Sequence, residues 1–540
     1  RSYYGARAVI IMPEQAAAFD VMLHGTGLAD GSIKGVHLMA PTMSLTRVGA
    51  KAAWTGVSSN IQALQLSNCV RFTLDDIGLQ NVDDGIKLDT DAGQTSSDYT
   101  VTNIRSLNVH TPIFTGGVKR LTGGVWKLRC PASASTDNKD HQVYVADGTE
   151  DMTVGDIEAD GGAGYALQCN GSSSTNPIKG VHFVDVRLKT VAYGCIAQQH
   201  CQDVTFDIVS IDGVAFAALN GSASRTGEVY TAATVAFTAA SKQITDTASG
   251  LGGYVVGDTV LASGGSVSAN NKAYVVVTAG AGTIVTAEAM SDQPAGGTIT
   301  LKGQSEIPVI SFSRFSIRNG QSGALMVSAS DAGIVKFAQG EVIGYGQGQV
   351  LNPSGSHHCV VDDVDFVDCN HGSLAVINCQ AGAALARLTV KRSTFYYSTS
   401  PRKEPLDLRG CSLAHVAGND FHSEVATSFA VFSSLTVGSH IARDNTYQNF
   451  ARFWATGSTQ GEGINNIDLT NRVVHSDGAN KFNRGLNTAN QFGGGTGVMG
   501  IADAAGTPTT SPTGGGVVYV VNGSLRYRGS AGSDTLLGSA

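Results

Sequence analysis

The chain has 540 residues, of which 67 are glycine and 12 are proline, and only 15% are charged. Its net charge of −8 argues against nucleic-acid binding, which needs clustered Lys and Arg, and no apolar run is long enough to cross a bilayer. Long amphipathic helices would need more Glu, Lys and Leu than this sequence provides. Small and β-branched residues instead suit narrow strands joined by glycine-rich turns, so the composition predicts an all-β protein.

The nine cysteines, an odd number, show neither a CxxC pair nor a Cys/His metal spacing. Cys69, Cys169 and Cys195 lie in apolar strand patterns, where a free cysteine behaves as a small hydrophobe. We therefore interpret the cysteines as reduced packing residues, consistent with synthesis in a bacterial cytoplasm. We expect no metal and no cofactor.

Residues 1–60 are predicted to form an opening turn or two of the fold, with turn signals at Gly25-Thr26-Gly27 and Asp30-Gly31. The chain starts at Arg1 without a signal peptide, which we interpret as the mark of a trimmed fragment that has lost an N-terminal part.

A recurring pattern occupies residues 61–224 and 304–493. It is an apolar alternation, a turn and a second short apolar run, as in Val181 to Leu188 followed by Val204 onward. Earlier copies begin at Val70, Tyr99 and Met152. Later copies return about every 26 residues, at Val309, Ile334, Val360, Leu388, Leu413, Ile441 and Ile467. Strands at such a period, without helical spacing, predict a right-handed parallel β-helix, a solenoid in which each strand pairs with its equivalent one repeat away.

Two segments interrupt this pattern. Residues 225–303 lack the period and hold short strands such as AYVVVT (273–278) between glycine-rich turns, which predicts an inserted small β-domain and a possible glycan-binding module. Residues 494–540 end in a run from Val517 to Val521, an Asn522-Gly523 turn and a run from Leu525 to Arg528, which predicts a β-hairpin.

The repeats of the form V-x-F-x-D-V-x-I resemble the pectate-lyase-like superfamily, specifically phage tailspike depolymerases. The segment GGGVVYVVNGSLRYRGSAG resembles the short piece that closes many phage tail-fibre and tailspike chains. This resemblance implies a homotrimer whose C-terminal segment serves trimerisation and whose missing N-terminal part joins the virion tail. It also implies that the protein is made in the host cytoplasm, acts outside the cell, and has capsule, exopolysaccharide or O-antigen as its substrate.

Glycoside hydrolysis normally needs two carboxylates that flank the bond. Asp83 and Asp84, followed by Gly85, Ile86 and Lys87, resemble the Asp-Asp-Gly-Ile element of polygalacturonases, although the other elements of that site are missing; the alternative is a simple turn. In the run from Asp156 to Asp160, Glu158 and Asp160 would share one face of a strand. Crowding of these carboxylates would favour a general acid, and the alternative is a pair of solvated acids.

A basic and aromatic cluster is the candidate substrate-binding region. Trp126 is expected to stack on a sugar, Arg129 and Lys139 to hold a uronate carboxylate, and His141 or Tyr144 to act as the base of a lyase. His110, Tyr165 and Tyr193 follow turns at comparable depths and are expected to line the same groove, and Lys87 is a further candidate. The alternatives are a solvated loop and ordinary packing residues.

A later His/Asp group carries no metal-ligand spacing, so we expect no metal there. It consists of Asp362, Asp363, Asp365, Asp368, His357, His358 and His371. The leading hypothesis is a phage tailspike depolymerase that cleaves a bacterial surface polysaccharide internally by hydrolysis. The alternatives are a lyase that acts on a uronic-acid-containing glycan and a non-catalytic glycan-binding tail adhesin.

Overall fold

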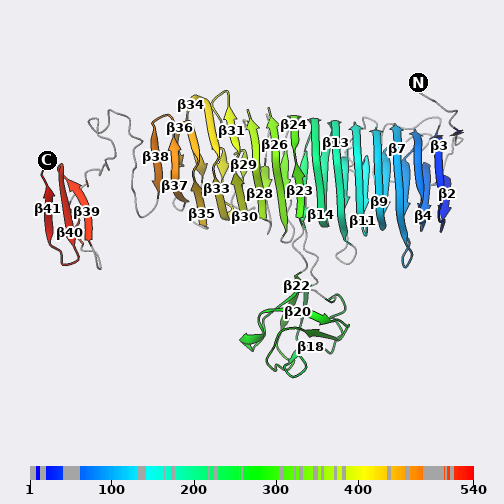
Figure 1. Cartoon of the computed structure of the whole chain (residues 1–540), viewed down its shortest axis with the longest axis horizontal. Coiled ribbons are helices and arrows are strands. Elements are labelled where there is room, and N and C mark those ends of the chain that lie inside the picture. Colours follow the sequence, from blue (N-terminus) through cyan, green and yellow to red (C-terminus); the bar gives the residue numbers. More distant parts are fainter. Residues whose placement is uncertain are drawn as a thin grey trace.

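The computed structural model describes residues 8–11, 20–40, 61–130, 141–162, 164–171, 177–216, 218–223, 229–254, 256, 259–304, 309–320, 324–327, 333–344, 351–353, 358–369, 374–379, 385–433, 439–455, 461–477, 504, 507–510 and 516–539. Within these residues the protein is all-β with parallel sheets, which confirms the predicted class, and the one helical piece is a short 3-10 turn, η1, at Ser268–Asn270. Figure 1 shows a long row of strands with an inserted unit beside its middle and a small sheet at its C-terminal end.

The first half of the row contains two stacks of parallel strands, because each strand pairs with the next strand but one along the chain. Stack A consists of β1 (Ala8–Ile11), β3 (Ser32–Met39), β5 (Thr73–Gln80), β7 (Ser96–Leu107), β9 (Val118–Arg129), β11 (Glu150–Asp160) and β13 (Ile178–Val191). Stack B consists of β2 (Asp20–Thr26), β4 (Ile61–Ser67), β6 (Asp84–Asp89), β8 (Thr111–Gly116), β10 (Val143–Ala146) and β12 (Tyr165–Asn170). The long strand β14 (Tyr193–Val214) continues both stacks.

The second half of the row continues the same parallel pairing beyond the insertion. Stack A continues through β23 (Val309–Ser313), β24 (Phe315–Gly320), β26 (Ile334–Ile343), β28 (His358–Val367), β30 (Leu385–Lys391), β31 (Thr394–Tyr397), β33 (Cys411–Ala417), β34 (Asp420–Ser433), β35 (Ser439–Arg443), β36 (Thr446–Trp454) and β37 (Gly461–Asp468). Stack B continues through β15 (Leu219–Ala223), β25 (Leu325–Val327), β27 (Leu351–Pro353), β29 (Ile377–Asn378) and β32 (Leu406–Asp407), and then through the C-terminal ends of β34 and β36, which contribute to both stacks. The antiparallel strand β38 (Val473–Asp477) pairs with β37 at the end of the row.

The core is built from columns in which like residues pack on like. Leu64, Ile86, Ile113, Val143 and Leu167 are successive register partners in stack B, and all are fully buried. In stack A, a second column stacks phenylalanine rings with centroids 4.9, 5.0 and 5.3 Å apart, namely Phe183, Phe206, Phe312 and Phe337. Alternation along each strand sends these apolar side chains inward and leaves every second side chain on the outer face.

All nine cysteines are free and buried, which confirms their interpretation as reduced packing residues. Burial raises the pKa of the Cys411 thiol to about 11, so that thiol stays protonated at neutral pH.

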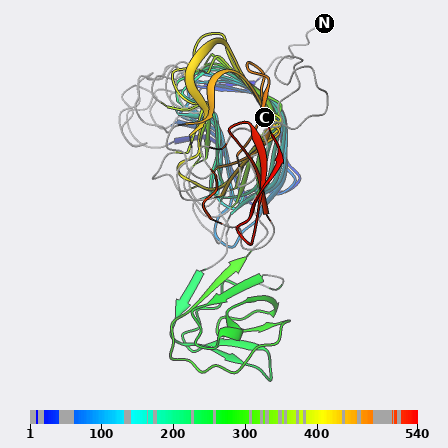
Figure 2. The ribbon, with the colours of Figure 1, turned by 90° about the vertical axis from the view of Figure 1, so that its left-hand side faces the viewer.

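The inserted unit is a separate seven-stranded antiparallel sheet in the order β16-β22-β19-β20-β21-β18-β17. Its strands are β16 (Val229–Ala232), β17 (Val235–Thr238), β18 (Gln243–Asp246), β19 (Thr259–Ser263), β20 (Ala273–Thr278), β21 (Thr283–Thr286) and β22 (Ile299–Gln304). It has its own apolar core, in which Phe237, Tyr274 and Ile299 are buried. Figure 2 views the row end-on and shows this unit, in green, below the row.

The C-terminal sheet has three antiparallel strands, β39 (Gly516–Val521), β40 (Ser524–Gly529) and β41 (Asp534–Gly538). The hairpin of β39 and β40 turns at Asn522 and Gly523, as the sequence predicts. Both turn residues have positive φ, 49° and 73°, which this two-residue turn requires and which Asn and Gly tolerate best.

Candidate functional site

An aromatic stripe runs along the outer face of stack B. Strand pairing aligns Phe114 with Tyr144, and Tyr165 with Tyr193, as direct register partners. Alternation turns Phe114 and Tyr144 outward, because their sequence neighbours Ile113, Thr115, Val143 and Val145 are buried. The four aromatic side chains are partly exposed, so consecutive repeats place rings on one surface.

The rings of this stripe touch one another without a break. The centroids are 5.4 Å apart for Phe114 and Tyr144, and 4.7 Å apart for Tyr144 and His141. The sequence of contacts continues at 5.7 Å from His141 to Tyr165, 4.6 Å from Tyr165 to Tyr193, and 4.9 Å from Tyr193 to Phe216. The aromatic stripe is therefore defined as Phe114, Tyr144, His141, Tyr165, Tyr193 and Phe216.

Ring orientation determines what the stripe presents to a ligand. The planes of His141 and Tyr144 differ by 16°, and those of Tyr193 and Phe216 by 19°, so these rings cover one another's faces. The contacts of Phe114 with Tyr144 and of Tyr165 with Tyr193 are tilted, at 46° and 41°, and the Tyr144 hydroxyl accepts a hydrogen bond from Asn170 Nδ2 at 3.1 Å. Phe216 is 51% exposed and lies at one end of the stripe. The surface combines apolar edges with hydrogen-bonding groups, a combination suited to amphipathic ligands.

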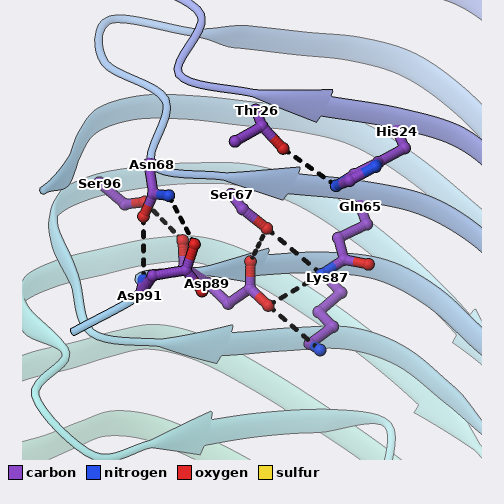
Figure 3. Close-up of polar contacts among 9 residues, drawn as sticks. All are labelled: His24, Thr26, Gln65, Ser67, Asn68, Lys87, Asp89, Asp91 and Ser96. Atoms are coloured by element: carbon purple, nitrogen blue, oxygen red, sulfur yellow. Dashed lines mark hydrogen bonds and ion pairs between the residues drawn. The ribbon is translucent and has the colours of Figure 1, made fainter. Parts of the chain in front are cut away.

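A polar cluster around Asp89, drawn in Figure 3, includes Lys87, which contacts the Phe114 end of the stripe. The Lys87 ammonium lies 5.8 Å from the centroid of the Phe114 ring and 3.1 Å from Asp89 Oδ2. Gln65 Nε2 donates to the same Asp89 oxygen at 3.0 Å, and the Ser67 hydroxyl donates to Asp89 Oδ1. Asp89 is thus held by three side chains from β4 and β6, and Lys87 joins this cluster to the Phe114 end of the stripe.

The predicted acid pair Asp83 and Asp84 lies beneath the surface. The two residues are only 2% and 4% exposed, at the bend that leads into β6. Asp84 and Gly85 belong to β6, so a simple turn does not describe the segment, and the catalytic role of the two carboxylates stays a prediction that their burial does not favour.

The pair Glu158 and Asp160 does lie on one outward face of β11, as alternation predicts, but it is surrounded by basic side chains. Glu158 is paired in register with Lys127 and Arg187, and its carboxylate lies 3.4 Å from Lys127 Nζ. Asp160 is flanked in register by Arg129 and Lys189. The expected crowding of like charges is therefore wrong, because pairing across the strands alternates acid with base.

The basic and aromatic cluster expected from the sequence separates into two parts. Trp126 and Arg129 belong to β9 of stack A, whereas His141 and Tyr144 belong to the stripe on stack B. Trp126 is 0% exposed and its indole N–H donates to the Val101 carbonyl at 2.9 Å, so the prediction that it stacks on a sugar is wrong. Arg129 is exposed, and Lys139 lies outside the described residues.

Burial also removes His110 from the expected groove. It is 0% exposed, and its carbonyl accepts a contact from Cys130 Sγ at 3.5 Å. The placement of Tyr165 and Tyr193 at one depth is confirmed by their register. Phe114 and Phe216 were not predicted as site residues. The sequence signal for Phe114 is its position one repeat before Tyr144, in a strand with the same alternation.

Two of the later acids, Asp362 and Asp368, are engaged by cations or by the backbone. Asp362 is contacted by Lys391 Nζ at 3.1 Å and Arg392 Nη2 at 2.6 Å, and Asp368 accepts from the Ser398 amide at 2.6 Å. His357 and His371 lie outside the described residues. Among the residues that are described, no group of three or more His, Cys, Asp or Glu side chains is arranged to hold a metal ion.

A further pair of stacked polar rings, which was not predicted, lies in the second half of the row. The Tyr396 and His422 rings are nearly parallel, at 3° and 5.4 Å, and Glu424 Oε1 accepts from the Tyr396 hydroxyl at 2.8 Å. That hydrogen bond is the main reason why the pKa of Tyr396 is raised above its ordinary value.

In the described part of the chain, no helix is long and apolar enough to cross a membrane. No protein-family model matches the sequence, and no curated protein matches it either.

Proposed function

We propose that this protein binds a bacterial surface polysaccharide along the aromatic stripe and cleaves it internally. The observation that carries this proposal is the unbroken ring contact from Phe114 through four successive strands of stack B to Phe216, which follows β14 and leads toward β15. At about 4.8 Å per strand, the stripe is about 20 Å long, room for several sugar residues. Sugars present apolar C–H faces and hydroxyl edges, which complement ring edges interleaved with phenol and imidazole groups.

The residues of the stripe suit β-elimination on a uronic acid better than hydrolysis. In that reaction a base removes the proton from C5, a C4–C5 double bond forms, the C4–O bond breaks, and an acid protonates the departing oxygen. His141 is proposed as the base and the Tyr144 phenol as the acid, since their rings lie 4.7 Å apart. Lys87, at the end of the stripe, is proposed to attract the uronate carboxylate. The carboxylates Glu158 and Asp160 that a hydrolase would use lie in stack A among basic side chains.

We further propose that the two stacks wind as a right-handed parallel β-helix and that the protein is a phage tailspike, carried on the virion as a homotrimer. Parallel pairing one repeat apart supports the winding. The C-terminal sheet supports self-association, because Val517, Val518, Leu536 and Leu537 are each more than two-fifths exposed on it. Light scattering should give three chains per particle; a stable monomer would contradict the tailspike proposal.

The activity is tested by digesting purified surface polysaccharides from candidate bacterial hosts while following reducing ends and ultraviolet absorbance together. Both signals should rise, because elimination leaves an unsaturated uronate. New reducing ends without absorbance would replace elimination by hydrolysis. Binding without any release of product would leave the protein an adhesin.

A further inference from the structure

A basic face lies on the outer side of stack A in the second half of the row. We define it as Lys336, His358, Arg387, His415 and Arg443, which come from β26, β28, β30, β33 and β35. Register brings these strands together: His358 pairs with Arg387, and Thr389 pairs with His415. The five side chains are partly or fully exposed, and each has a buried neighbour in its strand, namely Val335, Cys359, Leu388, Ala414 and Ala442.

Direct contacts join the centre of this face. His358 Nε2 lies 2.9 Å from the Thr389 hydroxyl, and Thr389 is the register partner of His415 on the next strand. Arg387 lies two residues before Thr389 on the same outward side of β30. Two imidazoles, a hydroxyl and a guanidinium therefore occupy neighbouring positions on three consecutive strands, a set of donors suited to an oxygen anion.

The cations of the basic face lack acidic partners within the described residues. Neither Lys336 nor Arg387 nor Arg443 has a carboxylate within ion-pair distance there, whereas Arg71, Arg120, Arg187 and Arg318 each pair with one. Asp362, four residues after His358 on β28, is already engaged by Lys391 and Arg392, and Asp444, which follows Arg443, accepts from Asn465 Nδ2 at 3.4 Å. The basic face is therefore locally positive, whereas the whole chain has a net charge of −8.

The histidines respond to these neighbours. Burial, followed by the charge of Arg387, lowers the pKa of His358 below its ordinary value of 6.5. Burial, followed by the charges of Arg443 and Arg387, lowers the pKa of His415 in the same way. Both imidazoles are thus largely neutral at neutral pH, and an anion placed between them and the arginines would reverse the electrostatic part of the shift.

We propose that the basic face is an anion-binding site, separate from the aromatic stripe, for the carboxylate or sulfate groups of an acidic polymer, and that it binds more tightly as the pH falls. The charged groups that face the two histidines are Lys336 on β26, Asp362 on β28, Arg387 and Lys391 on β30, and Arg443 on β35. Cations dominate this set, so each proton taken up by an imidazole strengthens an anion's attraction to the face. The proposal is independent of cleavage and of the stripe.

The test measures binding of the full chain to dextran sulfate and to polygalacturonate, with neutral dextran as the control polymer. Arg387→Gln should weaken binding of an anionic polymer by about tenfold, because it removes a charge-assisted contact. Arg120→Gln is the matched control, since it removes the same charge from an exposed guanidinium that pairs with Asp98. Equal losses in both variants would overturn the proposal in favour of general charge attraction. A loss confined to dextran sulfate would identify sulfate as the bound group, and one confined to polygalacturonate would identify carboxylate.

Proton linkage provides the second readout. The wild-type affinity should rise between about pH 8 and about pH 5, and the double variant His358→Gln/His415→Gln should lose most of that rise. Tyr193→Ala should leave dextran sulfate binding unchanged, which separates failure of this site from failure of the stripe. A pH dependence that survives in the double variant would contradict the role of the two histidines.

Discussion

Tyr165 and Tyr193 are direct register partners on adjacent strands, and their ring centroids lie 4.6 Å apart. The pair shows how a parallel stack converts sequence period into a surface: residues one repeat apart become neighbours on the outer face. Because His141 and Phe216 extend the contact on either side, the stripe is a product of the repeat and not of a single loop.

Cleavage should depend on the stripe and not on the acids of β11. Tyr144→Phe keeps the ring in place and removes the proposed acid, so it should lower kcat by about a hundredfold with little change in glycan affinity. Glu158→Gln, which only breaks an exposed pair with Lys127, should leave kcat within about twofold. Steady-state assays of both variants check this. Full activity in Tyr144→Phe together with loss of activity in Glu158→Gln would place hydrolysis on β11.

Trp126 should contribute to the stability of the fold and not to glycan binding. Trp126→Phe removes the indole donor from the Val101 carbonyl and leaves a small cavity in stack A. We expect a loss of about 2 to 4 kcal/mol in the free energy of unfolding, with unchanged glycan binding. Denaturant unfolding and a binding assay measure the two quantities, and weakened binding in a fully folded variant would return Trp126 to the site.

The inserted unit should lose stability in acid through Asp246. Burial alone would raise the pKa of this carboxyl, but hydrogen bonds from Thr234 at 2.5 Å, the Gly250 amide at 2.6 Å and Tyr230 at 2.8 Å outweigh it and lower the pKa from 3.8 to about 2. Because the folded-state pKa is depressed, the stabilisation is present above about pH 3.8 and is lost as the pH falls through about 2.

Calorimetry of wild type and Asp246→Asn checks this prediction. The variant's inserted unit should unfold at a lower temperature at neutral pH, and the difference should vanish near pH 2, the folded-state pKa. A difference that stays constant across this range would show that the charge of Asp246 does not contribute.

A buried asparagine ladder should stabilise the C-terminal part of the row. Asn445 Oδ1 accepts from the backbone and side-chain nitrogens of Asn419, both at 2.9 Å, and Asn445 Nδ2 donates to Asn466 Oδ1 at 2.8 Å and to the Val416 carbonyl at 3.1 Å. Asn445→Ala leaves several buried groups without partners and should lower the free energy of unfolding by about 3 to 5 kcal/mol.

The matched control for this ladder is Asn471→Ala, which removes an exposed amide that contacts Asp468 at 2.9 Å. Its effect should stay within about 0.5 kcal/mol in the same denaturant measurement. Similar losses in the two variants would contradict a special contribution from the ladder.

The sequence period predicts the parallel repeats well where loops are uniform. Met152, Val181 and Val204 begin three predicted repeats and are register partners in the structure, as are Val309 and Ile334. Register then departs from the period: Val360 pairs with Thr389 instead of Leu388. The loops differ in length between repeats, and a change in loop length shifts which residues pair. The alternation of side chains within a strand gives no information about loop length.

The site was predictable only in part, for a related reason. Alternation alone indicates that Trp126 and Leu128 share the inward face of β9, opposite the charged Lys127 and Arg129. The expected stacking of Trp126 on a sugar conflicts with this pattern. The contacts of His141 with Tyr144 and Tyr165, by contrast, depend on ring positions in two neighbouring repeats, which strand pairing sets and linear spacing does not.

The most direct test of the stripe as the glycan-binding surface compares the affinity of wild type, Tyr193→Ala and Tyr396→Ala for the polysaccharide that the protein recognises. Tyr396 is the matched control, since it is a partly exposed tyrosine stacked on His422 outside the stripe. Tyr193→Ala should weaken binding by about tenfold and Tyr396→Ala should change it by less than about twofold. Unchanged affinity in a folded Tyr193→Ala protein would contradict the account.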